Sequence, residues 1–413
     1  MSTDLAWLLL CTALVLFMTP GLAFFYGGLV KSKSVVSMMM LSFGSLGLIT
    51  VLWVLYGATG IGAISEGSGV SNFFGSPFQD FGLTEAVKAD DATLGGIAFG
   101  ATFAIITVAL ISGAIADRAR FFPWLLFAGI WATLVYFPGQ AWVWATNDDG
   151  DYIGWIGAGK GILNGTGALD WAGGTIVHQA AGAAALALAL VLGRRKVGFS
   201  KEESQPHNVP LVLIGASILW FGWFGFNTGV YGADEGQTSL IFLNTLVTPA
   251  AAMLGWLVME HFKEGKATAV GAASGIVAGL VAITPACAHI DPWVAMILGF
   301  LAGAVCAFAI EMKFKLGFDD TLDVVGIHLV AGFIGCVSLG FVAKYDGEGL
   351  FYGGGVDLLW SQFASSVIVI GYAFVVALVV GLAIEKTIGL RAKEEDEVAG
   401  IDLVLHGEGY AMD

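Results

Sequence analysis

Eleven stretches of this chain are long and apolar enough to cross a lipid bilayer as helices. The hydrocarbon core is about 30 Å thick, which about 20 helical residues span. The stretches cover roughly residues 5–29, 35–64, 94–116, 122–144, 171–192, 209–230, 239–260, 268–286, 292–311, 321–342 and 358–386. Charged residues make up only 12% of the 413 residues, about half the share usual in soluble proteins. The chain is therefore predicted to be an all-α, polytopic membrane protein.

The sequence between these spans leaves room for loops and a tail. The longest outer segments, about 65–93 and 145–170, are rich in Gly and Asp. We expect a membrane domain over residues 1–390 and a cytoplasmic tail over residues 391–413. The tail carries the acidic run 394–397 and is polar enough to be mobile or bound to a partner.

Charge and cysteine content exclude several classes of function. The 18 Lys and Arg face 33 Asp and Glu, so the net charge is −15. Without a basic stripe, nucleic-acid binding is excluded. The four cysteines stand singly in apolar surroundings and lack CxxC spacing, which is typical of buried small residues. We expect neither a metal nor another cofactor.

The distribution of Lys and Arg predicts the orientation of the spans. With the N-terminus outside, all except Lys88, Lys160 and Lys344 fall on the inner side, which is 15 of the 18. Because cytoplasmic loops carry the excess of positive charge, we expect the N-terminus out and the C-terminus in. The outer loops are then acidic, either because they lack this excess or because they attract cations to a pore mouth.

Two histidines within apolar spans lie in matching sequence contexts. The segments DWAGGTIVHQAAG (170–182) and DTLDVVGIHLVAG (320–332) both fit Asp-x7-His-x2-Ala-Gly, with His178 and His328 at the same position. The copies lie in spans five and ten and therefore enter the membrane from opposite sides. This is the pattern of an inverted repeat, with spans 1–5 related to spans 6–10 by a pseudo-two-fold axis in the membrane plane.

The repeat places both histidines at the centre of the bilayer. Each lies eight residues after an Asp, about 12 Å along a helix, which is close to half the hydrocarbon thickness. A lone histidine at this depth is often a packing residue, but a symmetry-matched pair indicates a pathway. Because burial disfavours charge, we expect neutral rings. Each ring then offers one N–H donor and one acceptor nitrogen to a small polar solute.

The aspartates that precede the histidines have open interpretations. Asp170 either caps span five by accepting backbone N–H bonds or stabilises a cation that enters from outside, and one residue can do both. Asp320 and Asp323 are expected to cap span ten.

Aromatic residues gather near the predicted outer ends of three spans. Phe99 and Phe103 share a helix face at i, i+4 spacing. Trp144 ends span four before the acidic loop 147–150, and Phe226 lies in the sequence WFGWFGFN of span six. Trp and Tyr collect at membrane interfaces in general. The alternative is a cation–π cage for a small ammonium-type cation.

Taken in order, the motifs resemble those of the ammonium transporter (Amt/Mep/Rh) family, in its prokaryotic Amt branch, over nearly the whole chain. The motifs are PGLAFFYGG (20–28), DWAGGTIVH (170–178), GWFGFN (222–227), TPAC (284–287), DDTLDVVGIH (319–328), and the tail elements Gly400-Ile-Asp and His406-Gly-Glu408. The resemblance implies an eleven-span homotrimer in the cell membrane, with one pore per subunit, that transports ammonium and is not an enzyme.

The resemblance also implies roles for the residues singled out above. Trp144 and Phe103, with Phe99 beside them, form an outer ammonium recruitment site supported by Asp170. By the same resemblance, Phe103 and Phe226 form a gate, below which His178 and His328 line the pore. Several relatives have a Ser where this chain has Val230, so a hydroxyl acceptor for ammonium is missing from the outer site.

The resemblance implies that a PII-type signalling protein regulates the pore through the tail at the cytoplasmic face. Ammonium resembles potassium in charge and size, but it can lose a proton. An aromatic gate above a narrow apolar pore excludes ions that cannot shed their charge. Whether a proton crosses with the ammonia is left open by the sequence.

Three other functions fit parts of the pattern. A sensor that binds ammonium but transports little is disfavoured because the chain has no fused output domain, only a short tail. A haem enzyme with His178 and His328 as axial ligands is disfavoured because redox motifs are missing. A sodium-coupled amino-acid transporter also uses inverted repeats, but it does not explain two histidines at the midplane, and the spans lack the paired helix breaks that its carboxylate site needs.

Overall fold

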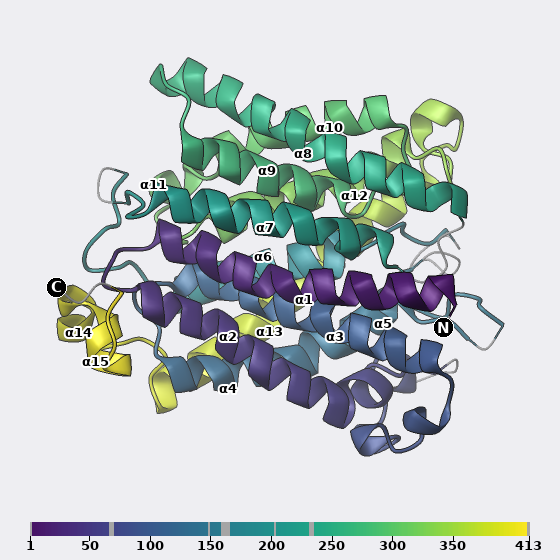
Figure 1. The fold of residues 1–413 in the computed structure, drawn as a ribbon, viewed down its shortest axis with the longest axis horizontal. Coiled ribbons are helices and arrows are strands. Elements are labelled where there is room, and N and C mark those ends of the chain that lie inside the picture. The colour runs from purple at the N-terminus through teal and green to yellow at the C-terminus, as the bar shows by residue number, and fades with distance from the viewer. Residues whose placement is uncertain are drawn as a thin grey trace.

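The computed structural model describes residues 2–65, 70–147, 149–157, 166–201, 204–230 and 235–410. In these residues the regular structure is helical, apart from three isolated β-bridges. The helices run side by side along one direction, with the start of the first helix at one end of the bundle and the tail at the other (Figure 1). Lys160, one of the three basic residues predicted outside, Asp148 of the acidic loop and the last three tail residues lie outside the described residues.

The α-helices have the following bounds: α1 (Thr3–Leu29), α2 (Val35–Leu52), α3 (Asp91–Ile111), α4 (Phe121–Trp131), α5 (Phe137–Trp144), α6 (Ala180–Leu192), α7 (Val209–Thr228), α8 (Glu235–Glu264), α9 (Ala269–Ile283), α10 (Pro292–Ala309), α11 (Met312–Leu316), α12 (Val330–Val342), α13 (Asp357–Thr387), α14 (Glu394–Ala399) and α15 (Ile401–His406). Four π-helical segments continue or start these helices: Trp53–Ile61, Ala132–Tyr136, Gly174–Gln179 and Val325–Leu329.

Ten helical segments among the described residues are long and apolar enough to cross a membrane. The eighth predicted span, 268–286, is the remaining one and forms the shorter apolar helix α9 of 15 residues, which packs against α7, α8 and α10. This helix ends at Ile283 because Pro285 has no N–H for the next helical hydrogen bond and its ring clashes with the preceding turn. The result is a polytopic membrane protein whose eighth span is helical over only part of its predicted length.

The helix contacts repeat in the two halves of the chain. In the first half α1 packs on α2 and α3, and α2 packs on α3 and α4; in the second half α7 packs on α8 and α9, and α8 packs on α9 and α10. The first helices of the two halves, α1 and α7, lie along each other (Figure 1). These matching contacts agree with the predicted inverted repeat of spans 1–5 and 6–10.

Spans five and ten also begin in the same unusual way. Gly173 and Asp323, each three residues after the motif Asp, have positive φ angles of 105° and 63°. A π-helical segment follows each of them and carries the histidine. Hydropathy does not predict these paired irregularities, because it reports the length of a span and not its helix type.

The glycines that end the two motifs bring the two spans into close contact. A Cβ added to Gly182 would lie 2.6 Å from the Cβ of Leu329, and one added to Gly332 would lie 3.3 Å from the Cβ of His178. Small residues allow such close helix approach inside a membrane. Each glycine therefore makes room for the histidine segment of the other repeat.

The described part of the tail, residues 391–410, lies against the inner loops. The carboxylate of Asp402 accepts hydrogen bonds from Val36 N at 3.0 Å and Ser37 N at 2.8 Å, which caps the start of α2. The guanidinium of Arg391 donates to Leu192 O at 2.7 Å and pairs with Glu397 at 2.7 Å. The tail therefore gains its order from the membrane domain.

A buried ionic cluster joins the inner ends of the two repeats. Arg195 pairs with Asp117 at 3.0 Å and with Asp319 at 2.9 Å. Arg118 lies 3.9 Å from the Asp319 carboxylate, and its side chain is completely buried. Burial lowers the pKa of Arg118 to about 10, although Asp319 opposes this effect, so the guanidinium remains charged at neutral pH.

Candidate functional site

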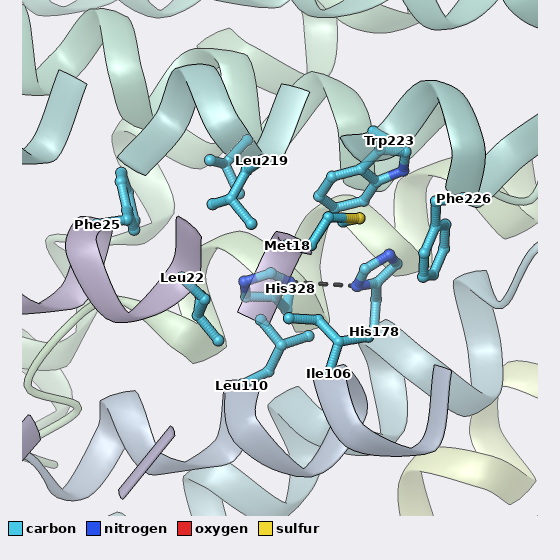
Figure 2. Close-up of a pocket in the computed structure, with 11 residues that line it drawn as sticks. Met18, Leu22, Phe25, Ile106, Leu110, His178, Leu219, Trp223, Phe226 and His328 are labelled. Atoms are coloured by element: carbon cyan, nitrogen blue, oxygen red, sulfur yellow. Dashed lines mark hydrogen bonds between the residues drawn. The ribbon is translucent and has the colours of Figure 1, made fainter. Parts of the chain in front are cut away.

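A small enclosed cavity lies between the two repeats at the level of the two histidines (Figure 2). It is lined by Met18, Leu22, Phe25, Ile106, Leu110, His178, Leu219, Trp223, Phe226, Val277 and His328. The centre of a water-sized molecule can move within about 10 Å³ of this cavity. This is roughly the space that one water molecule requires. The cavity therefore has room for a single small molecule among mostly apolar walls.

The two histidines meet at the base of this cavity, as the repeat predicts. Their Nδ1 atoms are 3.3 Å apart, and their rings are stacked at 5.3 Å with an interplanar angle of 25° (Figure 2). One ring must donate an N–H and the other must accept it. The Nε2 atom of His178 is buried and has no hydrogen-bond partner among the described residues, so it can bond a molecule in the cavity that His178 lines.

This geometry leaves no room for an iron held axially by the two rings. Metal–imidazole bonds are about 2 Å long, so two ligands on opposite sides of a metal stand about 4 Å apart. His178 and His328 face each other directly through a hydrogen bond of 3.3 Å. The haem interpretation does not fit the structure.

Two stacked phenylalanines lie beside the cavity, and one of them, Phe226, forms part of its wall. The rings of Phe103 on α3 and Phe226 on α7 are stacked at 3.9 Å with an interplanar angle of 11°. The ring of Phe226 also lies 6.2 Å from that of His178. Phe226 therefore connects the stacked pair to the histidine at the cavity.

The other aromatic residues of the predicted outer site, Phe99 and Trp144, contact the ring of Phe103. Phe99 lies 4.8 Å from Phe103, as the i, i+4 spacing predicts, and Trp144 meets Phe103 edge-on at 6.2 Å. The indole of Trp144 donates a hydrogen bond to Asp170 O at 2.8 Å, which fixes its orientation. Phe99, Phe103 and Trp144 therefore form one aromatic cluster, in which Trp144 is partly exposed.

The carboxylate of Asp170 is occupied by local donors. It accepts hydrogen bonds from Gly173 N at 3.0 Å, Gly174 N at 2.6 Å and Thr175 N at 2.9 Å, and from the Thr175 hydroxyl. Asp170 therefore caps the π-helical start of span five, which supports the capping interpretation of the sequence.

Span ten has the equivalent cap with one difference. Asp320 accepts hydrogen bonds from Val324 N at 3.1 Å and Val325 N at 2.7 Å. The side chain of Asp323, which was expected to cap the same span, instead pairs with Lys313 at 2.6 Å. Asp323 has a positive φ angle because it lies in the turn before the helical segment. The carboxylate of Asp320 closes this turn through its bonds to Val324 N and Val325 N.

Comparison with known proteins identifies the family. A sequence model described as Ammonium Transporter Family matches residues 6–410. Ammonium transporters of Mycobacterium tuberculosis and Bacillus subtilis are 48% and 40% identical to this chain. The alignments cover 98% and 99% of this chain and 90% and 98% of the relatives. The chain belongs to the ammonium transporter family.

Solved structures of the ammonium transporter family share this fold. Mep2 of Candida albicans matches with a TM-score of 0.82 at 29% identity, over 95% of this chain and 87% of that one. Mep2 of Saccharomyces cerevisiae matches with a TM-score of 0.82 at 30% identity, over 95% and 88%. A structure named Sensor Amt Protein matches with a TM-score of 0.84 at 24% identity, over 98% of both chains, which shows the fold alone.

Family membership supports ammonium transport by a multi-pass membrane protein. These relatives of the ammonium transporter family are transporters and not enzymes, as the sequence predicts. One residue near the histidines was missed by the sequence analysis: Trp223, which stacks on His178 at 5.4 Å. Its place in the aromatic sequence of span six was the available signal, but an indole there is equally typical of a membrane interface.

Proposed function

We propose that ammonium binds at Trp144, Phe99 and Phe103, loses its proton above the gate of Phe103 and Phe226, and crosses the cavity as ammonia. The observation that carries this proposal is the closed aromatic stack directly above a histidine pair with a free Nε2 on His178. A site of this kind suits a solute that is a cation outside and a neutral hydrogen-bonding molecule inside.

The physical argument concerns what each ion can do at the gate. Ring faces attract ammonium and potassium alike through cation–π interactions. Ammonium can leave its proton outside and enter an apolar, water-sized cavity as a neutral molecule, whereas potassium cannot shed its charge. In the cavity ammonia accepts or donates a hydrogen bond with whichever tautomer the histidine pair adopts.

The proposal is tested with the full-length protein in proteoliposomes. An inward ammonium gradient is expected to produce a flux well above that of protein-free liposomes, and an equal potassium gradient is expected to produce none. Binding of ammonium without flux would favour the sensor interpretation. Equal conduction of both ions would contradict the proposal.

Replacing Trp144 with leucine is expected to raise the ammonium concentration for half-maximal flux by roughly two- to fivefold, since one exposed cation–π contact contributes about 0.5–1 kcal/mol. The measurement is the initial rate of ammonium flux against ammonium concentration. The control is Trp360→Leu, because Trp360 is 49% exposed on α13 and stacks only on Phe363 among the rings of the described residues. An unchanged half-saturation in Trp144→Leu would assign Trp144 to the interfacial aromatic residues.

We also propose that three copies assemble in the lipid bilayer, each with its own pore. Exposed apolar side chains along α8, α10 and α13 support this proposal, because they need either lipid or another subunit beside them: Phe242, Leu246, Leu254, Ile297, Leu301, Val305, Val367, Val375 and Val379. Native mass spectrometry of the purified protein is expected to give three times the chain mass.

Regulation by a PII-type protein is proposed to act through the tail. Deleting residues 391–413 is expected to leave an assembled, conducting membrane domain but to weaken inhibition by the partner, because Asp402 and Arg391 tie the tail to the inner loops. The measurement is binding of the cognate PII protein together with ammonium flux, for the full-length and the truncated chain.

The control for this deletion neutralises only the first two residues of the acidic run, by changing Glu394 and Glu395 to Gln, which keeps the contacts of Asp402. This variant is expected to retain partner control. Equal binding and equal inhibition of the full-length and truncated chains would show that the tail has no regulatory role.

A further inference from the structure

The turn that ends the short helix α9 touches the outer site. Trp171 N donates a hydrogen bond to Pro285 O at 3.2 Å, and Ala172 N donates one to Thr284 O at 3.2 Å. These two donors directly follow Asp170, whose carbonyl holds the Trp144 indole. The backbone of the turn therefore supports the segment on which the outer aromatic site rests.

The side chain of Thr284 contacts Trp223 in the wall of the histidine cavity. It is completely buried, and its hydroxyl donates to Leu280 O at 2.7 Å and accepts a hydrogen bond from Trp223 Nε1 at 2.8 Å. An indole N–H can only donate. The single hydroxyl proton of Thr284 is donated to Leu280 O, so the hydroxyl oxygen is left to accept from Trp223. The direction of the hydrogen bond from Trp223 to Thr284 is therefore fixed.

Trp223 is a wall of the cavity on which two site residues pack. Its ring stacks on His178 at 5.4 Å with an interplanar angle of 20°, and it lies 5.4 Å from the ring of Phe226 (Figure 2). The cavity has room for about one water-sized molecule. A rotation of this indole therefore changes whether a molecule can pass.

We propose that Thr284 is a positioning residue for conduction, because its hydroxyl fixes the Trp223 indole and thereby His178 and the inner ring of the gate. The inference rests on the proposed function. The hydroxyl of Thr284 supports the cavity. The outer site is instead held by backbone carbonyls and by the hydrogen bond from Trp144 to Asp170. Maximal flux should depend on the hydroxyl, and half-saturation should not.

The first test is Thr284→Val in proteoliposomes, which removes the hydroxyl and keeps the branched shape. An indole N–H left without an acceptor in a buried site is costly, so Trp223 is expected to leave its position. Maximal ammonium flux per folded protein is expected to fall by roughly tenfold, with half-saturation within about twofold of wild type. Thr284→Ser keeps the hydroxyl and is expected to restore the flux.

Thr245 offers a matched control. It is also completely buried, its hydroxyl donates to Ile241 O at 2.7 Å, and it accepts a hydrogen bond at 2.9 Å from Asn227 Nδ2, which is likewise on α7. Thr245→Val therefore removes an equivalent bond to the same helix without touching Trp223. It is expected to leave maximal flux within about twofold of wild type.

A double-mutant cycle separates positioning from a general structural effect. Trp223→Phe has no N–H, so adding Thr284→Val in this background is expected to cause no further loss of flux. Additive losses, or wild-type flux in Thr284→Val, would overturn the positioning role. Absence of ammonium flux in the wild-type protein would instead overturn the proposed function.

Discussion

Replacing His178 with alanine is expected to abolish the ammonium-specific flux, measured as the flux in an ammonium gradient minus the flux in an equal potassium gradient. The change removes the Nδ1 partner of His328, 3.3 Å away, and a wall of the cavity. Either the pore no longer solvates ammonia or the enlarged space admits water and ions. Removing one preorganised hydrogen-bonding group from an enclosed site typically costs about 10²–10³ in rate.

His328→Ala is expected to have the same effect, because each ring supplies the other with its hydrogen-bond partner. His261→Ala is the control, since His261 is exposed in the last turn of α8. Wild-type flux with unchanged selectivity in both cavity variants would remove His178 and His328 from the pore.

Replacing Asp319 with alanine is expected to destabilise the folded protein by about 3–5 kcal/mol, the usual cost of removing one partner of a buried ion pair. Asp319 pairs with both Arg118 and Arg195, and its side chain is completely buried. Without it, Asp117 is the carboxylate left beside the two guanidinium groups in the described part of the chain. Thermal unfolding in detergent measures the loss, and Glu85→Ala, in an ion pair exposed on both sides, should cost no more than about 1 kcal/mol.

The contribution of Asp319 should also depend on pH. Burial tends to raise the pKa of this carboxyl, but the guanidinium groups of Arg118 and Arg195 outweigh burial and hold the pKa below its usual value. The folded state therefore binds this proton more weakly than the unfolded state does. The stabilisation is complete above the usual value of about 4 and is lost as the pH falls through the lowered pKa. The difference in stability between wild type and Asp319→Ala should stay constant between about pH 5 and pH 7 and shrink below about pH 4.

The sequence predicts the relation of the two histidines well because that relation is repeated and periodic. One motif occurs twice, five spans apart, and the distance from Asp170 to His178 equals that from Asp320 to His328. Depth and symmetry then follow from helix geometry and bilayer thickness alone. The number of spans follows from hydropathy in the same way.

Contacts between elements far apart in the chain have no such local signal. The sequence shows Thr284 and Pro285 as part of a motif, but not that the hydroxyl meets Trp223, 61 residues earlier. Hydropathy likewise treats 268–286 as one span, although α9 ends at Ile283. The docking of Asp402 on α2, 365 residues away for its bond to Ser37, was also beyond sequence patterns.

If Phe103 and Phe226 form the proposed gate, their contact at 3.9 Å has a consequence for the membrane as a whole. Where the resting route is shut, passage waits for two packed rings to move apart, and such motion in a crowded interior is slower than the picosecond-to-nanosecond flips of exposed side chains. The rate of transport is then set by how often the rings separate and not by the width of a permanent pore. A membrane crowded with many copies therefore keeps its electrical potential, because each copy is insulating between the brief moments in which it lets one molecule through.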